Sequence, residues 1–250
     1  MRKVFSNILT LVAILSLFVR CDNDSAPDCL KKAGNTTTVE LEVDAFEKIE
    51  ITNSLNVFIK QANEQRVELT VSSNLINDID YSVNENGVLF LTNNVGCKWV
   101  RSYGFPEVTI YTSDINNIIN NGDGTVASID TLKLDRLSVS CEDRSGDFDL
   151  TIETEYFGVV TNSLTNLHVD GITDEFRIFF AAGDGRFEGE NLKIRKANVT
   201  NRGSNDIIVN VSDTLTGSIL SAGNIILKGS RPKLIDIEDK NLGELIDQTQ

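Results

Sequence analysis

The histidine content of the chain limits the catalytic chemistry that it can support. The 250 residues contain one histidine, His168, which lies between Leu167 and Val169. Since side chains alternate along a strand, two buried neighbours predict that His168 points outward. One histidine cannot form a multi-histidine metal site, and no neighbouring residues indicate a Ser-His-Asp arrangement. We therefore predict no catalytic residue, no metal ligand, no cofactor and no enzyme activity.

Carboxylates form the second group of residues that could do chemistry. One group is a cluster in the sequence: Glu142, Asp143, Asp147 and Asp149. The other group occupies equivalent turn positions: Asp123 and Asp184. Stacked carboxylates could bind calcium, or could act as acid and base on a polysaccharide. However, calcium-binding repeats of this general kind recur about every nine residues, and the turns here recur every 20. Asp and Asn also favour tight turns by themselves, because their side chains bond to nearby backbone. A calcium-stabilised module and a polysaccharide-acting enzyme therefore stay as alternatives.

The segment Gly96–Phe105 is the candidate ligand-binding loop. It combines the only tryptophan, Trp99, with Arg101, Tyr103 and a lysine in an otherwise acidic chain. Aromatic faces stack on sugars or peptides, and arginine pairs with carboxylates, so these three residues could contact a glycan or a protein ligand. The preferred alternative is structural, with Trp99 and Phe105 filling a junction between two parts of the fold.

Composition and the N-terminus indicate where the protein acts. The formal net charge of −14 excludes electrostatic capture of nucleic acid. Residues 1–20 have a basic start followed by a short apolar run, which predicts a signal peptide. Cys21 and the acidic residues after it resemble the processing site of a bacterial lipoprotein, although Arg20 stands where that family has a small residue. The resemblance implies that Cys21 is lipidated, that residues 21–36 form a flexible tether, and that the membrane is a partner through the lipid anchor. Simple secretion and an uncleaved membrane anchor are the alternatives.

The other cysteines could form a disulfide, because an exported protein reaches an oxidising compartment. They are Cys29, Cys97 and Cys141, and an odd number leaves at least one of them unpaired. Their spacing fixes no pairing and does not match a metal site.

Residues 37–114 predict an antiparallel β region. Period-2 alternation of apolar residues runs through residues 39–43, 49–51, 55–59 and 67–71. Asn86-Gly87, between two further apolar segments, is a strong hairpin signal.

Residues 115–250 predict a solenoid, because turns and apolar residues recur every 20 residues. The turn positions are Asp123, Asp143, Ser163, Gly183, Gly203 and Gly223. Five of them are preceded, by four positions, by apolar residues that we expect to stack inward in a column: Val139, Val159, Phe179, Val199 and Ile219. Others follow the last four turns: Leu167, Phe187, Ile207 and Leu227. A strand, a turn and a second strand per period describe one coil of a β-solenoid, with polar ladders from Thr161, Asn201 and Ser221. We predict an all-β fold in which antiparallel N-terminal strands lead into a right-handed parallel β-solenoid of about 20-residue coils, with a C-terminal cap after Pro232.

The turn sequences also resemble a known family. Asn121–Gly124, Ser145–Asp147, Ala182–Gly185, Arg202–Ile207 and Ala222–Ile225 look like degenerate copies of the Gly-Ser-Gly-Asp motif of the putative auto-transporter adhesin head GIN domain family. The likeness covers residues 40–246. It implies an exported, mostly β, lipoprotein-like protein without a catalytic motif.

Together these features predict a non-catalytic lipoprotein of the bacterial cell envelope with an adhesin-like or scaffold role. We expect an outer-membrane lipoprotein that is surface-exposed or periplasmic.

Overall fold

The computed structural model describes residues 34–96, 104–142, 144–239 and 241–250. The predicted lipidation site Cys21 and the predicted binding residues Trp99, Arg101 and Tyr103 lie outside the described residues. The strands are β1 (Thr36–Leu41), β2 (Lys48–Asn53), β3 (Asn56–Gln61), β4 (Arg66–Ser72), β5 (Ile79–Val83), β6 (Val88–Asn93), β7 (Glu107–Thr112), β8 (Asn117–Gly122), β9 (Val126–Ser128), β10 (Leu132–Cys141), β11 (Phe148–Thr161), β12 (Asn166–Phe180), β13 (Arg186–Asn201), β14 (Ile207–Ile219), β15 (Ile225–Leu227), β16 (Leu234–Asp239) and β17 (Leu245–Asp247). One short 3-10 helix, Ser73–Asp78, joins β4 to β5.

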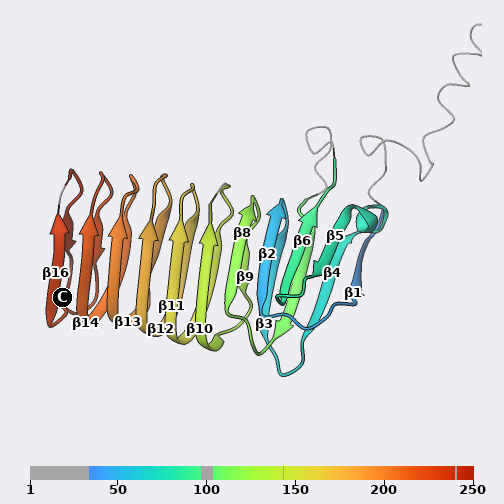
Figure 1. Ribbon diagram of the computed structural model, residues 1–250, viewed down its shortest axis with the longest axis horizontal. Helices are drawn as coiled ribbons and strands as arrows, with labels where there is room; N and C mark the ends of the chain where they lie inside the picture. Colours follow the sequence, from blue (N-terminus) through green and yellow to red (C-terminus); the bar gives the residue numbers. More distant parts are fainter. Residues whose placement is uncertain (1–33, 97–103, 143, 240) are drawn as a thin grey trace, which may run out of the picture.

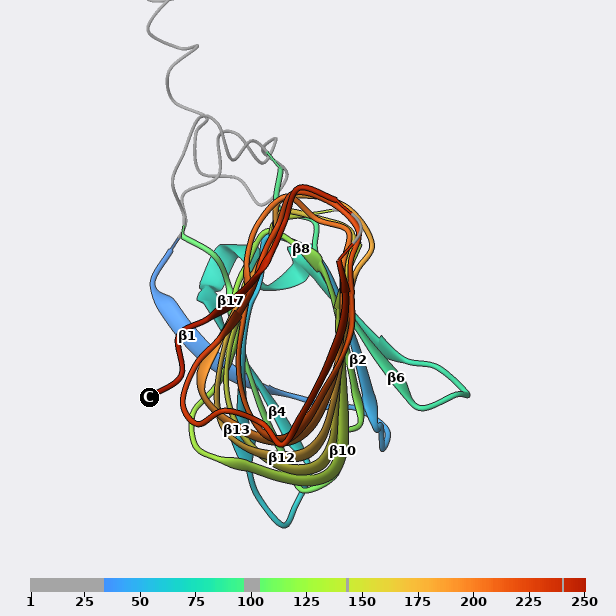
Figure 2. The same ribbon diagram turned by 90° about the vertical axis from the view of Figure 1, so that its left-hand side faces the viewer.

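The chain winds into a stack of flattened coils, which confirms the predicted all-β solenoid (Figure 1). Seen along the stack, each coil is an oval with two broad sides (Figure 2). The side that faces the viewer in Figure 1 is called sheet A here, and contains β5, β6, β2, β8, β10, the C-terminal halves of β11–β14, and β16. The opposite side, sheet B, contains β1, β4, β7, β3, β9, the N-terminal halves of β11–β14, β15 and β17.

Parallel register aligns the inward side chains of successive coils into columns. Val139 pairs with Val159, exactly one predicted period later, and both are buried. The next partner is Ile178 and not Phe179, because this coil is one residue shorter. Since one residue reverses the face of a strand, the prediction that Phe179 points inward is wrong. The predicted ladder of Thr161 and Asn201 is also interrupted, because Phe180 lies between them in register.

The apolar residues after the turns fill the core as predicted, with one exception in register. Leu167, Phe187 and Ile207 are aligned and buried, but their next partner is Ile225 instead of Leu227. Aromatic rings also stack between neighbouring coils, with 5.0 Å between the ring centroids of Phe176 and Phe187. Aromatic contacts of this kind add to the stabilisation from burial.

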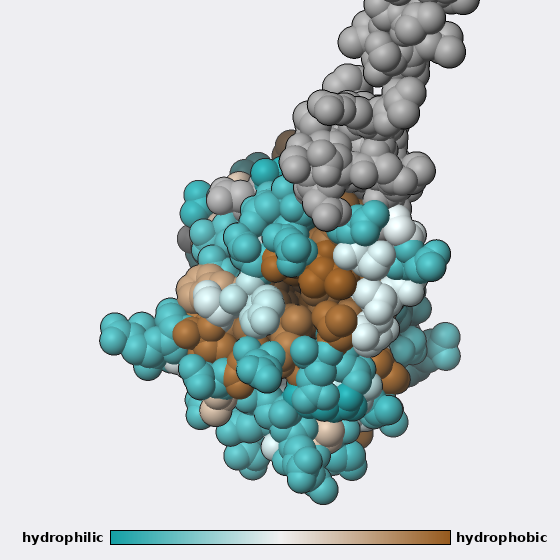
Figure 3. All heavy atoms as spheres, turned by 90° about the vertical axis from the view of Figure 1, so that its right-hand side faces the viewer, coloured by the Kyte–Doolittle hydropathy of each residue, from teal (hydrophilic) through white to brown (hydrophobic). Residues whose placement is uncertain are grey.

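The N-terminal part is only partly antiparallel. β1 pairs with β4, β4 with β7, and β5 with β6 in antiparallel fashion, and Asn86-Gly87 forms the predicted hairpin turn. In contrast, β2 pairs in parallel with β6 and β8, and β3 with β7 and β9. Residues 48–61 thus form a solenoid coil that is inserted between strands that follow them in sequence. Viewed from the N-terminal end, apolar atoms gather near the centre and hydrophilic atoms surround them (Figure 3).

The segment after Pro232 continues the stack instead of covering its end. β16 pairs with β14, and β17 pairs with β15, both in parallel. Within the described ranges, β16 pairs with β14 alone and β17 with β15 alone. No helix in the described part of the chain is long and apolar enough to cross a membrane.

The glycine-containing turns stack along the upper edge of Figure 1, where consecutive coils come close together. Gly183 has φ +88°, and a Cβ at this position would lie 2.2 Å from the carbonyl oxygen of Ser163 in the preceding coil. Only glycine fits such a conformation and approach without strain. Glycine in the turn sequences that carry the family resemblance therefore permits neighbouring turns to approach as closely as the paired strands do.

Candidate ligand-binding groove

Of the predicted binding loop Gly96–Phe105, the structure describes Gly96, Gly104 and Phe105. Phe105 leaves 44% of its surface exposed, so this residue does not fill the junction as the structural alternative expected. The roles of Trp99, Arg101 and Tyr103 stay predictions, because these residues lie outside the described ranges.

A different feature, an open groove of about 280 Å³, lies on the outer face of sheet A. It crosses β8, β10, β11 and β12, near the middle of the stack (Figure 1). The lining residues are Asn117, Ser138, Val139, Ser140, Glu142, Tyr156, Gly158, Val159, Val160, Arg177 and Phe179. The volume is close to the lower end of the range for small-molecule sites, which is about 300 Å³.

Glycine makes the floor of the groove. Register places Gly158 between Ser138 of the preceding coil and Arg177 of the next coil, and all three residues occupy outward positions of their strands. A Cβ on Gly158 would lie 3.1 Å from ring carbon Cε1 of Tyr156 and 3.2 Å from Oγ of Ser138. The absence of a side chain thus creates the depression into which the tyrosine leans.

A tyrosine that is held by an arginine forms one wall. Tyr156 is two residues before Gly158, so its side chain lies on the same face of β11. The guanidinium carbon of Arg136 lies 4.5 Å from the centroid of the tyrosine ring, a cation–π geometry. Because Arg136 comes from the neighbouring coil, the fold itself holds the ring in position.

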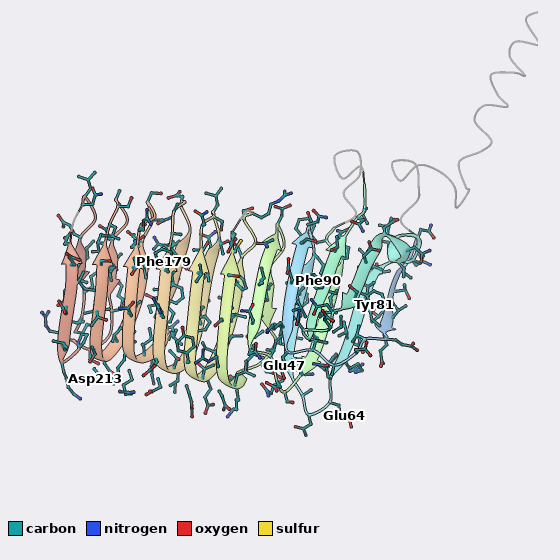
Figure 4. All side chains as sticks on the ribbon, viewed as in Figure 1. Glu47, Glu64, Tyr81, Phe90, Phe179 and Asp213 are labelled. Atoms are coloured by element: carbon teal, nitrogen blue, oxygen red, sulfur yellow. The ribbon has the colours of Figure 1, made fainter. Side chains whose placement is uncertain are left out.

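Two apolar side chains form the second wall. Ser140, Val160 and Phe179 are aligned in register, and Val160 is 44% exposed. Phe179 projects from sheet A and is half-buried (Figure 4). The one-residue shortening before β12 therefore moves Phe179 from the core to the groove.

Several polar groups of the groove have no hydrogen-bond partner among the described residues. The hydroxyls of Ser138 and Ser140, the guanidinium of Arg177 and the carboxylate of Glu142 bind no described side chain or backbone group. The carbonyl oxygen of the Asn117 side chain is shielded from water and also accepts no hydrogen bond within the described structure. Unpartnered donors and acceptors that surround an aromatic wall are a common arrangement in sites for polar ligands.

Among the described lining residues Glu142 is the only carboxylate, so these residues do not form the paired carboxylates of a glycosidase. The turn carboxylates instead join coils. Asp147 accepts hydrogen bonds from Asn166, and Asp184 accepts one from Ser204. In the described part of the chain, no group of three or more His, Cys, Asp or Glu residues has a metal-binding arrangement.

His168 lies outward on sheet B, away from the groove. Its ring nitrogens are 3.5 Å from Asp170 and 3.9 Å from Glu188, and its side chain is 45% exposed. Cys141 is buried in the core as a free thiol. Neither residue contributes to the groove.

Sequence reasoning did not find the groove. Its residues are spread over four strands, and they align only when the 19-residue step between Val160 and Phe179 is known. The local signal in the sequence was Gly158, two residues after Tyr156. A glycine within a strand also marks a simple strand irregularity, so this signal was not specific.

Comparisons with known proteins agree with this architecture. A putative adhesin from Bacteroides fragilis aligns with a TM-score of 0.76 at 22% identity, over 85% of this chain and 97% of that one. A putative lipid binding protein from Parabacteroides distasonis aligns with a TM-score of 0.64 at 18% identity, over 86% of this chain and 97% of that one. A putative adhesin from Parabacteroides merdae aligns with a TM-score of 0.62 at 18% identity, over 85% and 98% of the two chains.

No curated protein matches the sequence. The sequence profile described as "Putative auto-transporter adhesin, head GIN domain" matches residues 45–230, which is most of the described solenoid. The chain belongs to the putative auto-transporter adhesin head GIN domain family.

Proposed function

We propose that this protein is a non-catalytic, adhesin-like binding protein of the bacterial cell envelope, anchored by a lipid on Cys21. The groove on sheet A is the surface that contacts its macromolecular partner. The observation that carries this proposal is the set of polar groups, without a partner among the described residues, beside Tyr156 and Phe179 on a stack of paired strands. Sites that are built on rigid elements lose little conformational entropy when they bind.

The anchor and the groove are compatible in space. The first described strand, β1, lies at one end of the stack, and the groove lies near the middle of sheet A (Figure 1). A tether that precedes β1 would thus attach the solenoid by its end and leave sheet A open to a partner.

The family description and two of the similar structures support an adhesin role, and one similar structure carries the description of a lipid binding protein. The groove described above favours adhesion. It is open, and its mixed polar and aromatic lining differs from the enclosed apolar cavity that an acyl chain would need.

Fractionation of the producing cells tests the anchor. We expect the full chain in the membrane fraction and a Cys21→Ala variant in the soluble fraction, because several acyl chains each add about 0.8 kcal/mol per buried methylene. Cys29→Ala is the matched control, since it removes another cysteine of the predicted tether. Recovery of the unmodified chain in the soluble fraction, or an unchanged distribution of Cys21→Ala, would overturn the anchored function.

Protease treatment of intact cells tests the side of the membrane. Loss of the full chain would place the solenoid outside the cell and support adhesion. Protection of an anchored chain would place it in the periplasm and contradict adhesion to external partners.

A further inference from the structure

We infer that the groove on sheet A binds a neutral glycan chain, so that the adhesin-like protein is a lectin for uncharged polysaccharide. This inference rests on the proposed binding function and adds the chemical class of the ligand. Four features of the groove carry it.

The first feature is the pair of aromatic walls around a glycine floor. Tyr156 and Phe179 come from neighbouring coils on either side of Gly158 in the lining. The C–H groups on the face of a sugar ring are weakly positive, and they pack well on the negative face of an aromatic ring. Arg136 fixes the orientation of Tyr156 before a ligand arrives, which reduces the entropy lost on binding.

The second feature is the type of polar group. Ser138 and Ser140 offer hydroxyls, Arg177 offers a planar set of donors, and Glu142 offers two acceptor oxygens. Sugar hydroxyls both donate and accept, so one class of ligand can satisfy all of these groups.

The third feature is the state of the backbone beneath the groove. β11 pairs with β10 on one side and with β12 on the other along the whole floor. Its N–H and C=O groups are therefore already in the ladder, and none is free for the main chain of an extended peptide. Peptides that add to sheets use unpaired edges, which this surface lacks.

The fourth feature is charge. Arg177 and Glu142 are the charged residues among the described lining residues, and their opposite charges balance each other. The whole chain carries a formal net charge of −14, which would repel an acidic polymer. An uncharged chain avoids this repulsion.

The outward column of Phe179 also shows how a longer ligand would lie. Thr200 and Ser218 follow Phe179 in register on the next two coils. Strand spacing of about 4.8 Å places these hydroxyls along the axis of the stack. The glycan would therefore cross the strands and follow this column.

Calorimetric titration of the full chain, in a detergent without a sugar headgroup, tests the inference. The neutral probes are oligomers of glucose, mannose and N-acetylglucosamine. The comparison probes are polygalacturonate and an extended Gly-Ser-Thr peptide. We expect at least one neutral oligomer to bind, with an affinity that changes little when salt is added, because no ion pairs form.

Two variants locate the binding. Phe179→Ala removes an aromatic wall and Gly158→Val fills the floor, and we expect each to weaken binding at least tenfold. Phe90→Ala is the matched control, because Phe90 also projects from sheet A but on β6, outside the groove (Figure 4). Thermal melting of each variant reports whether it is folded, and Arg177→Gln replaces any variant that is not.

Several results would overturn the inference. One is that no neutral oligomer binds. Another is that polygalacturonate binds more tightly than the neutral oligomers and in a salt-sensitive way. A third is that Phe90→Ala weakens the binding of a neutral oligomer as much as Phe179→Ala does. Binding of the peptide that depends on Phe179 would reject the glycan but keep the groove as the binding surface. Fractionation and protease results do not depend on these titrations, so failure of the proposed function is detected separately.

Discussion

The guanidinium carbon of Arg136 lies 4.5 Å from the centroid of the Tyr156 ring, and the two residues come from neighbouring coils of the solenoid. The contact therefore depends on correct stacking of the coils. It connects the register of β10 and β11 to the shape of the groove, because Tyr156 leans over Gly158.

Arg136→Gln should weaken ligand binding more than it weakens the fold. Cation–π contacts at exposed sites contribute about 0.5–1 kcal/mol, so we expect the free energy of unfolding to fall by about that amount. The freed ring should also lower the affinity for the ligand. Arg66→Gln is the control, since Arg66 lies 4.0 Å from the centroid of Tyr111 on sheet B. Equal losses of affinity in both variants would contradict this role of Arg136.

Two glycines with positive φ separate the cost of backbone strain from the cost of steric clash: Gly183 in a stacked turn and Gly104 in the loop before β7. Gly183 and Gly104 both have positive φ, but only Gly183 has backbone of another coil within reach of a new Cβ. We expect Gly104→Ala to cost about 1 kcal/mol of stability from strain alone. Gly183→Ala should cost at least about 2 kcal/mol more, because the turn must also move away from Ser163. Chemical denaturation measures both, and similar costs would show that the close approach is unimportant.

The sequence predicted the features of the fold that have local causes. Tight turns need glycine, Asn or Asp, and alternation identifies strands, so the solenoid, its 20-residue period and the Asn86-Gly87 hairpin could all be predicted. Phe179 shows the limit of counting periods, because a coil that is one residue shorter reverses the face of the strand. The turn at residues 162–165 lacks the glycines of the other turns, which indicates a different turn but not that it is one residue shorter.

The pairing of β2 and β3 could not be predicted for a different reason. Both strands alternate in the same way whether their partners are parallel or antiparallel, and their partners lie far away in sequence. Predicting the groove would require both the length of each coil and the strand pairing, because the groove forms only when Ser138, Gly158 and Arg177 are aligned in register.

Asn201 is a buried polar residue whose removal should be costly. Its side chain accepts a hydrogen bond from the backbone N–H of Gly203 and donates to the carbonyl oxygens of Asn205 and Asn224. Asn201→Ala would leave these groups without their partner, at about 1–3 kcal/mol for each unsatisfied group. We expect a total loss of about 3 kcal/mol in denaturant unfolding, and Asn198→Ala on the exposed face should cost far less. A loss below about 1 kcal/mol would mean that water replaces the side chain.

Asp213 should make stability depend on pH in the acid range. A hydrogen bond from Lys233, together with the nearby charge of Arg195, lowers the pKa of this carboxyl below its ordinary value. Because the folded-state pKa is lowered, the stabilisation is present above the ordinary pKa of about 3.9 and disappears as pH falls through the folded value. The Tm difference between the unmodified chain and Asp213→Asn should thus shrink below about pH 4. Asp135→Asn, which removes a carboxylate without a described ion pair, should show no such trend. A pH-independent difference for Asp213→Asn would exclude the ion pair as the cause.

Asp239 lies at the inward position of the last coil, where it should oppose stacking of further strands. In register it follows Ile219, which is fully buried, and β16 has no second partner among the described strands. Another strand on this edge would have to bury the carboxylate, and inward charges are a known protection of sheet edges. We expect Asp239→Val to associate as concentration rises, as measured by light scattering during size exclusion. Asp236→Val is the matched control, because Asp236 pairs with Thr216 in an outward column of the same strand. Both variants lose one negative charge, so association of Asp239→Val alone assigns the effect to the inward position, whereas equal association of both would assign it to net charge.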